Sequence, residues 1–212
     1  MRIRAFLAAA FLAAPLIANA QSYEVGGAGG FAVQRGLHVE SGSVKGTVGF
    51  KEAPVAGAWL AETGPRWGGE VRYLYRWGDA RVEVGGEKAA LSARQHIITG
   101  DLMLFLKGGK DAPVRPFIIF GGGVRRVEGT GPQQAFHPGS QYAALANTSE
   151  TLPVGDFGVG VRVRAGPRGV FRLEVRDYLS PKTDNVIAAA PGSKLTGLMH
   201  DVIILAGLGF TF

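Results

Sequence analysis

The chain has 212 residues, no cysteine and a formal net charge of +6. The absence of cysteine excludes a disulfide scaffold and metal sites with cysteine ligands. The positive excess is modest and spread along the chain, which disfavours a nucleic-acid-binding protein.

The N-terminus carries the three features of a secretory signal peptide. Arg2 and Arg4 form a short positive region, residues 5–17 are apolar, and Ala18-Asn19-Ala20 is a cleavage site of the A-x-A type. The apolar run is too short for a helix that crosses a membrane. We therefore predict a signal peptide at 1–20 and one mature domain of ordinary size at 21–212.

The rest of the chain alternates apolar and polar residues with a period of two, which is typical of β-strands with two different faces. We predict strands at 23–33, 45–62, 67–77, 89–106, 114–127, 154–165, around 171–176 and at 197–212. Pro54 removes a ladder donor from the second strand, so the register of that strand stays open.

Short and long connections join these strands in turn. Short turns lie near residues 64, 110 and 167, whereas the segments 36–42, 78–88, 128–151 and 180–196 have no clear strand pattern and are predicted to be loops. This rhythm indicates an all-β fold, an eight-stranded antiparallel up-and-down transmembrane β-barrel with long loops at one end.

The last strand has the clearest alternation. Its apolar face is about ten residues long, the length that a tilted strand needs to cross a bilayer. Counting back by twos from the C-terminus, this face contains Phe212, Phe210, Leu208, Ala206, Ile204 and Val202.

Charged residues in the clearer strands share the opposite face. Because an arginine that faces lipid at mid-membrane costs roughly 2–4 kcal/mol, we predict that these side chains point into the lumen. An eight-stranded barrel is just wide enough for its own side chains, so they are expected to form a salt-bridged network that plugs it. The network comprises Glu70, Arg72, Arg76, Asp101, Arg125, Arg162, Arg164, Arg172, Glu174, Arg176 and Asp201.

The charged lumen permits a second interpretation, a narrow pore or a ligand pocket that opens when the ion pairs shift. A hydrolase site built on Glu70 and Glu174 is disfavoured, because neighbouring arginines hold both carboxylates ionised. Asp177 lies on the apolar parity near a strand end. We expect no cofactor and no metal site, since no ligand spacing occurs among His38, His96, His137 and His200.

Four stretches carry a resemblance to a known family: Tyr73-Leu74-Tyr75, Arg115-Pro116-Phe117 leading into Gly121-Gly122-Gly123, residues 172–178, and the terminal residues 207–212. They resemble the OmpA-like outer-membrane β-barrel superfamily. The resemblance implies a location in the bacterial outer membrane, with outer-membrane lipid and lipopolysaccharide as partners. It also implies that Phe210 and Phe212 form the signal that the barrel assembly machinery recognises. OmpA itself has a C-terminal peptidoglycan-binding domain that we do not expect here, so wall anchoring is not implied.

Two functions follow from this resemblance. The first is a monomeric, non-enzymatic barrel whose loops serve envelope integrity or surface interaction, with no nucleic-acid partner. The second is a lipid-modifying enzyme similar to the lipid A deacylases, which use a serine, a histidine and a glutamate on the outward surface. His96 and His200 have outward parity, and Ser92 and Ser180 are the nearest serines. We assign no catalytic residue.

Overall fold

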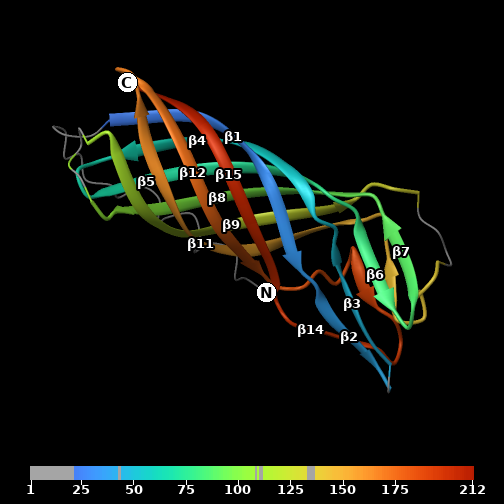
Figure 1. The fold of residues 1–212 in the computed structure, drawn as a ribbon. Coiled ribbons are helices and arrows are strands. Elements are labelled where there is room, and N and C mark those ends of the chain that lie inside the picture. The colour runs from blue at the N-terminus through green and yellow to red at the C-terminus, as the bar shows by residue number, and fades with distance from the viewer. Residues whose placement is uncertain (1–21, 43, 108, 110–111, 133–136) are drawn as a thin grey trace, which may run out of the picture.

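The computed structural model describes residues 22–212 except 43, 108, 110–111 and 133–136, so the predicted signal peptide lies outside the described residues. The fold is a closed antiparallel barrel, as predicted (Figure 1). Its strands are β1 (Ser22–Arg35), β4 (Ala53–Thr63), β5 (Trp67–Trp77), β8 (Ala93–Phe105), β9 (Val114–Gly129), β11 (Ser149–Ala165), β12 (Gly169–Ser180) and β15 (Met199–Thr211).

The barrel closes between its first and last strands. Strand β1 pairs with β15 on one side and with β4 on the other, so that Phe31 lies opposite both Ile204 and Pro54. Pro54 is the second residue of β4, and a position at the beginning of a strand tolerates the missing N–H group. The register that the sequence left open is therefore fixed.

Short and long connections leave the barrel at opposite ends, as predicted. The turns between β4 and β5 and between β11 and β12 have three residues each, and Gly166 in the second adopts a φ of +78°, a conformation that favours glycine. The C-terminus lies at the same end of the barrel as the short turns (Figure 1).

The prediction of irregular loops at the other end is wrong. Most of these segments form two small sheets, which we call the sheet module. Its five-stranded sheet has the order β14-β2-β3-β6-β7 and its two-stranded sheet pairs β10 with β13. The strands are β2 (Leu37–Ser41), β3 (Val44–Phe50), β6 (Ala80–Val84), β7 (Glu87–Leu91), β10 (Ala143–Leu145), β13 (Ile187–Ala189) and β14 (Lys194–Thr196).

The predicted second strand at 45–62 is also divided. Strand β3 belongs to the sheet module and β4 to the barrel, and Lys51 and Glu52 separate them. The two segments have similar alternation, so the pattern alone does not reveal the break.

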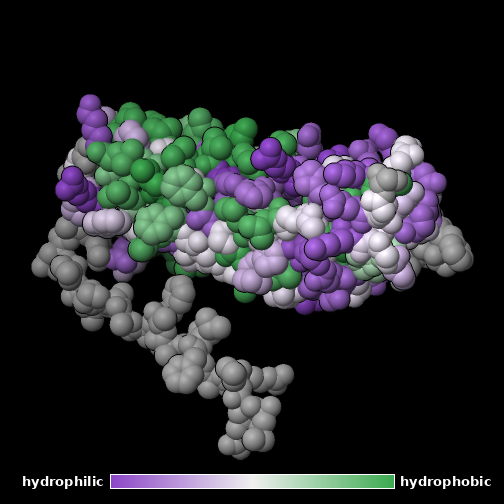
Figure 2. Space-filling view, turned by 90° about the horizontal axis from the view of Figure 1, so that it is seen from below, coloured by the Kyte–Doolittle hydropathy of each residue, from purple (hydrophilic) through white to green (hydrophobic). Residues whose placement is uncertain are grey.

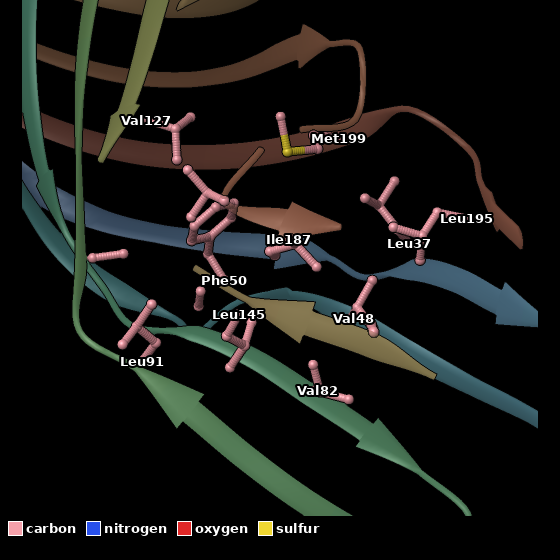
Figure 3. Packing of buried hydrophobic residues seen from close by; sticks show 14 of the residues in the cluster. Leu37, Val48, Phe50, Val82, Leu91, Val127, Leu145, Ile187, Leu195 and Met199 are labelled. Carbon is pink, nitrogen blue, oxygen red and sulfur yellow. The ribbon is translucent and has the colours of Figure 1, made fainter. Parts of the chain in front are cut away.

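The sheet module has an apolar core of its own (Figure 3). In β2, Leu37 and Val39 point into this core while His38 is exposed, and Val82 and Val84 of β6 follow the same alternation. The ends of the barrel strands contribute as well, through side chains such as Val127 and Met199. Because burial of one Val or Leu side chain stabilises by about 1.5–3 kcal/mol, this core holds the connections in a defined fold.

The outward face of the barrel is apolar. Large side chains such as Val71, Ile98, Val124, Val159 and Ile204 are roughly half exposed, although they lie in the middle of long strands. Apolar residues gather over the barrel and polar residues over the sheet module (Figure 2). A belt of this kind faces lipid in a transmembrane barrel. Within the described residues, no helix is long and apolar enough to span a membrane.

Candidate functional site

Buried charges fill the barrel lumen. Alternation along each strand directs these side chains inward, and most residues of the predicted network are at most 5% exposed: Glu70, Arg72, Arg76, Asp101, Arg125, Arg162, Arg172, Glu174, Arg176 and Asp201. Arg164 is half-buried, close to the turn that leads to β12. The structure divides these charges into two groups, where the sequence suggested one network.

The larger group, which we call the lower tier, lies nearer the short turns. Glu70 is at its centre. Its carboxylate lies 2.6 Å from Arg72 Nε, 2.6 Å from Arg172 Nη1 and 3.4 Å from Arg176 Nη1. Glu174 contacts the same three arginines at 2.9, 3.1 and 3.9 Å. Both acids are held by several cations at once, and Glu70 has the shorter contacts.

Three further acids complete the lower tier. Arg176 Nη2 lies 2.6 Å from Asp101 Oδ2 and 3.0 Å from Asp156 Oδ2, so one nitrogen serves two carboxylates. Glu24, from the first strand, accepts a hydrogen bond of 2.8 Å from Arg162 Nε. The tier therefore links the first strand to β11 and β12.

The indole of Trp59 lies inside the lower tier. Its Nε1 donates a 3.0 Å hydrogen bond to Glu24 Oε1, and the guanidinium carbons of Arg72 and Arg172 lie 5.4 and 4.8 Å from the ring centre. Glycines on β1 and β15 make room for the ring, because a Cβ atom at Gly26, Gly207 or Gly209 would lie within about 3 Å of it. The glycines of these strands are thus needed for close packing.

An apolar layer lies above the lower tier. It consists of buried side chains contributed by strands all around the barrel: Ala32, Val55, Leu74, Ile97, Val154, Tyr178, Ile203 and Leu205. Its position is clear on β5, where the inward residues are Arg72, Leu74 and Arg76 in order. On β12 the order is Arg176, Tyr178 and Ser180.

The smaller group of charges, the upper tier, lies between the apolar layer and the sheet module. Asp201 forms ion pairs with Arg125 Nη1 at 2.7 Å and with Arg76 Nη1 at 3.3 Å. Arg125 also donates to Ser180 Oγ at 3.0 Å, and Arg76 donates to the Lys51 carbonyl at 2.8 Å. All three charged side chains are fully buried.

The sequence reasoning missed three buried charges, Glu24, Arg115 and Asp156. Asp156 shares the parity of Arg162, and Arg115 shares that of Arg125, so the signal was present in both strands. Glu24 stands in a strand so rich in glycine that its two faces cannot be told apart by hydropathy. Arg115 lies outside the ion pairs: its Nη2 donates to the Gly64 and Pro65 carbonyls at 2.7 and 2.9 Å, and its guanidinium stacks 3.5 Å from the centre of the Phe105 ring.

Within the described part of the chain, the outward histidines contact residues other than serine. His200 Nδ1 lies 3.1 Å from Asp177 Oδ2, and His96 Nδ1 lies 2.9 Å from the Tyr73 hydroxyl. Ser180 is buried on the inward face, where it accepts from Arg125. A serine–histidine–carboxylate arrangement is therefore not formed at His200 by the serine that the sequence offered.

The sheet module is charged on its exposed face. Lys88 and Glu83 form an ion pair of 3.0 Å across β6 and β7. The hydrogen bond from Lys88, together with its charge, holds the pKa of Glu83 below its usual value. A cavity of about 130 Å³ opens beside β7 and is lined by Leu91, Ser92 and His137 among others.

Comparisons with known proteins agree with the geometry. No protein-family model and no curated protein matches the chain. Among solved structures, the chain is similar to the outer membrane protein OprG from Pseudomonas aeruginosa, with a TM-score of 0.52 and 14% identity over 92% of this chain and 98% of that one.

Two further solved structures are similar at lower TM-scores. The N-terminal β-barrel domain of Pseudomonas aeruginosa OprF has a TM-score of 0.47 and 11% identity over 92% of this chain and 100% of that one. Ail, the attachment invasion locus protein of Yersinia pestis, has a TM-score of 0.48 and 12% identity over 90% of this chain and 99% of that one. The OprG-like fold agrees with the closed barrel and with its apolar outward belt. The chain has the fold of the small, OmpA-like outer-membrane β-barrels.

Proposed function

We propose that this protein is a non-enzymatic outer-membrane barrel that is closed to solutes and presents the sheet module at the cell surface. The observation that carries the proposal is the order of layers along the lumen. Charged tiers, the apolar layer and the module core follow one another, and every layer consists of buried side chains. A continuous path for water would have to cross two apolar layers.

The sheet module supports a role in surface interaction or envelope integrity. Its apolar core and paired strands give the exposed face a fixed shape, which a partner can recognise without an entropic cost of ordering. We further propose outer-membrane lipid, including lipopolysaccharide, as the immediate partner of the barrel wall. Arg94 and Arg126 support this: both are exposed and share one carboxylate, Glu128, at 2.6 Å each, so the cluster keeps a net positive charge that an anionic headgroup can neutralise. The barrel is expected to work as a monomer, without nucleic acid or cofactor.

Conductance tests the closed lumen. We expect the wild-type barrel in a planar bilayer to show no ion conductance. The triple variant Phe50→Gly/Leu74→Gly/Ile203→Gly, which removes large side chains from both the module core and the apolar layer, should conduct. The matched control is Val71→Gly/Ile98→Gly/Ile204→Gly, because these three side chains lie on the outward face. Ion conductance through the wild-type barrel would rule out a closed lumen.

The second candidate function is lipid modification, favoured by the outward pair of His200 and Asp177. A histidine oriented by a carboxylate can act as a general base. Comparing the lipid A mass spectra of cells with and without the protein discriminates the two functions. We expect identical spectra. A mass change that disappears in His200→Ala would support the enzyme instead.

Recognition by the barrel assembly machinery is also a proposal. Phe212 directly follows β15, and its exposed ring stacks on that of Tyr23 with 6.1 Å between the ring centres. The two residues also exchange backbone hydrogen bonds of 3.0 and 3.1 Å. We expect that deletion of Phe212 strongly reduces insertion into the outer membrane. Thr211→Ala, which removes only a 3.0 Å bond to the Arg168 carbonyl, should leave it unchanged.

The deletion also removes the two backbone hydrogen bonds, so a side-chain variant is needed beside it. Phe212→Ala keeps the backbone and should still reduce the membrane yield on immunoblots of fractionated cells. Equal yields of Phe212→Ala and Thr211→Ala would show that the terminal ring is not the signal.

A further inference from the structure

The upper tier has more positive than negative charge. Among the described residues, Asp201 is the only acid that forms an ion pair with Arg76 or Arg125. Glu150 lies further along the inward parity of β11, but its Oε2 accepts from Thr183 Oγ1 and from the Asp184 and Asn185 amides. The tier thus buries two guanidinium groups against one carboxylate, a net charge of +1. An uncompensated buried charge is costly, and proteins normally pair it.

The tier also has more unpartnered hydrogen-bond donor atoms than acceptor atoms. Among the described residues, the donor atoms without a hydrogen-bond partner are Arg76 Nε and Nη1, Arg125 Nε and Nη2, Gln34 Nε2 and Gln95 Nε2. The acceptor atoms without one are Gln95 Oε1 and the two Asp201 carboxylate oxygens, which take part in the ion pairs. Each of these side chains is at most 6% exposed. Buried donors in native proteins almost always have a partner.

The barrel register brings these groups to one level. Gln95 lies directly opposite Arg76 on the neighbouring strand, and Gln34 lies directly opposite Asp201. Arg125 reaches the same carboxylate from β9. The donors therefore surround the Asp201 carboxylate from several sides of the barrel.

Apolar side chains lie both above and below these groups. The apolar layer lies below them, through Leu74 and Ile97, which precede Arg76 and follow Gln95 in the inward order of their strands. The module core lies above them, since the Phe50 ring is 5.9 Å from the Arg76 guanidinium carbon and the Phe50 amide donates to Gln34 Oε1. Such an enclosure excludes a large ligand.

We propose that the upper tier is a binding site for one small monovalent inorganic anion, such as chloride, held by Arg76, Arg125 and the amides of Gln34 and Gln95. One negative charge neutralises the tier, and an anion accepts several hydrogen bonds without needing any donor in return. The bound anion stabilises the barrel at the point where the sheet module joins it.

Thermal unfolding of the mature barrel in detergent tests the site. Chloride is titrated against gluconate, which is too large to enter, at constant ionic strength. At a chloride concentration 100 times the dissociation constant, the Tm of the wild type should rise by roughly 5–10 °C. Gln95→Glu places a carboxylate opposite Arg76 and should abolish the chloride dependence. Asp201→Asn raises the net charge of the tier and should shift the titration midpoint to lower chloride.

Thr148→Glu is the matched control, because it adds the same charge at an exposed position and should keep the wild-type chloride dependence. If Gln95→Glu does not fold, wild-type crystals grown in bromide decide: an anomalous peak between Arg76 and Arg125 supports the site. Equal chloride dependence of the wild type and Gln95→Glu overturns the proposal. The proposal is also overturned if the bromide crystals show only water at the donor atoms of the upper tier.

Discussion

Glu70→Ala is expected to lower the free energy of unfolding by roughly 3–5 kcal/mol, the loss that follows when one partner is removed from a buried ion pair. The substitution removes one of the two carboxylates that Arg72, Arg172 and Arg176 share, the one with the shorter contacts, and leaves only Glu174 to all three in a buried tier. Differential scanning calorimetry in detergent should show this loss as a fall in Tm of about 6–20 °C.

Glu40→Ala is the control for this experiment. Its ion pair with Lys45, at 3.6 Å, joins side chains that are 51% and 79% exposed, and surface pairs of this kind contribute about 0–1 kcal/mol. Similar melting temperatures of the two variants would mean that water replaces the missing carboxylate in the lumen. The lower tier would then be hydrated rather than closely packed.

Trp59→Ala is expected to have an effect of similar size, about 3–5 kcal/mol, because removal of a large buried ring leaves a cavity. The indole is 2% exposed, and its loss also removes the hydrogen-bond donor to Glu24 and the ring beside Arg72 and Arg172. Chemical denaturation followed by far-UV circular dichroism would report this loss as a shift of the midpoint at a constant m-value.

Trp67→Ala provides the comparison, because this ring is 55% exposed at the beginning of β5. It should change the midpoint only slightly. A Trp59→Ala barrel as stable as Trp67→Ala would show that the neighbouring arginines collapse into the space, and that the glycines around the ring are not required for its packing.

The barrel strands were predictable from sequence because lipid on one side and a packed lumen on the other enforce strict alternation. In β5 the inward Glu70, Arg72 and Arg76 alternate with the outward Val71 and Tyr73, and its bounds match the predicted ones. The same constraint identified most of the buried charges. Their division into two tiers was not predictable, because Leu74 and Ile97 form the apolar layer only when strands distant in sequence are brought to one level.

The sheet module was missed because its strands are short. The alternation in Ala80–Val84 is regular, but five residues between turn-forming segments give too little pattern to outweigh their polar surroundings. Strands β10, β13 and β14 have three residues each and depend on the module core for their order. Tertiary packing, rather than local preference, decides the structure there.

The packing of Trp59 against glycines of β1 and β15 bears on how the barrel closes during folding. Strands β1 and β15 are the first and last of the chain, so their pairing has the largest sequence separation in the fold and is intrinsically slow. The glycines that these two strands turn toward the indole leave little to interlock when the edges meet. The Trp59 ring on β4 can therefore take its final position before the barrel closes. We expect closure to follow when β1 and β15 pair, since the glycines they turn toward the ring have no side chains to obstruct the pairing.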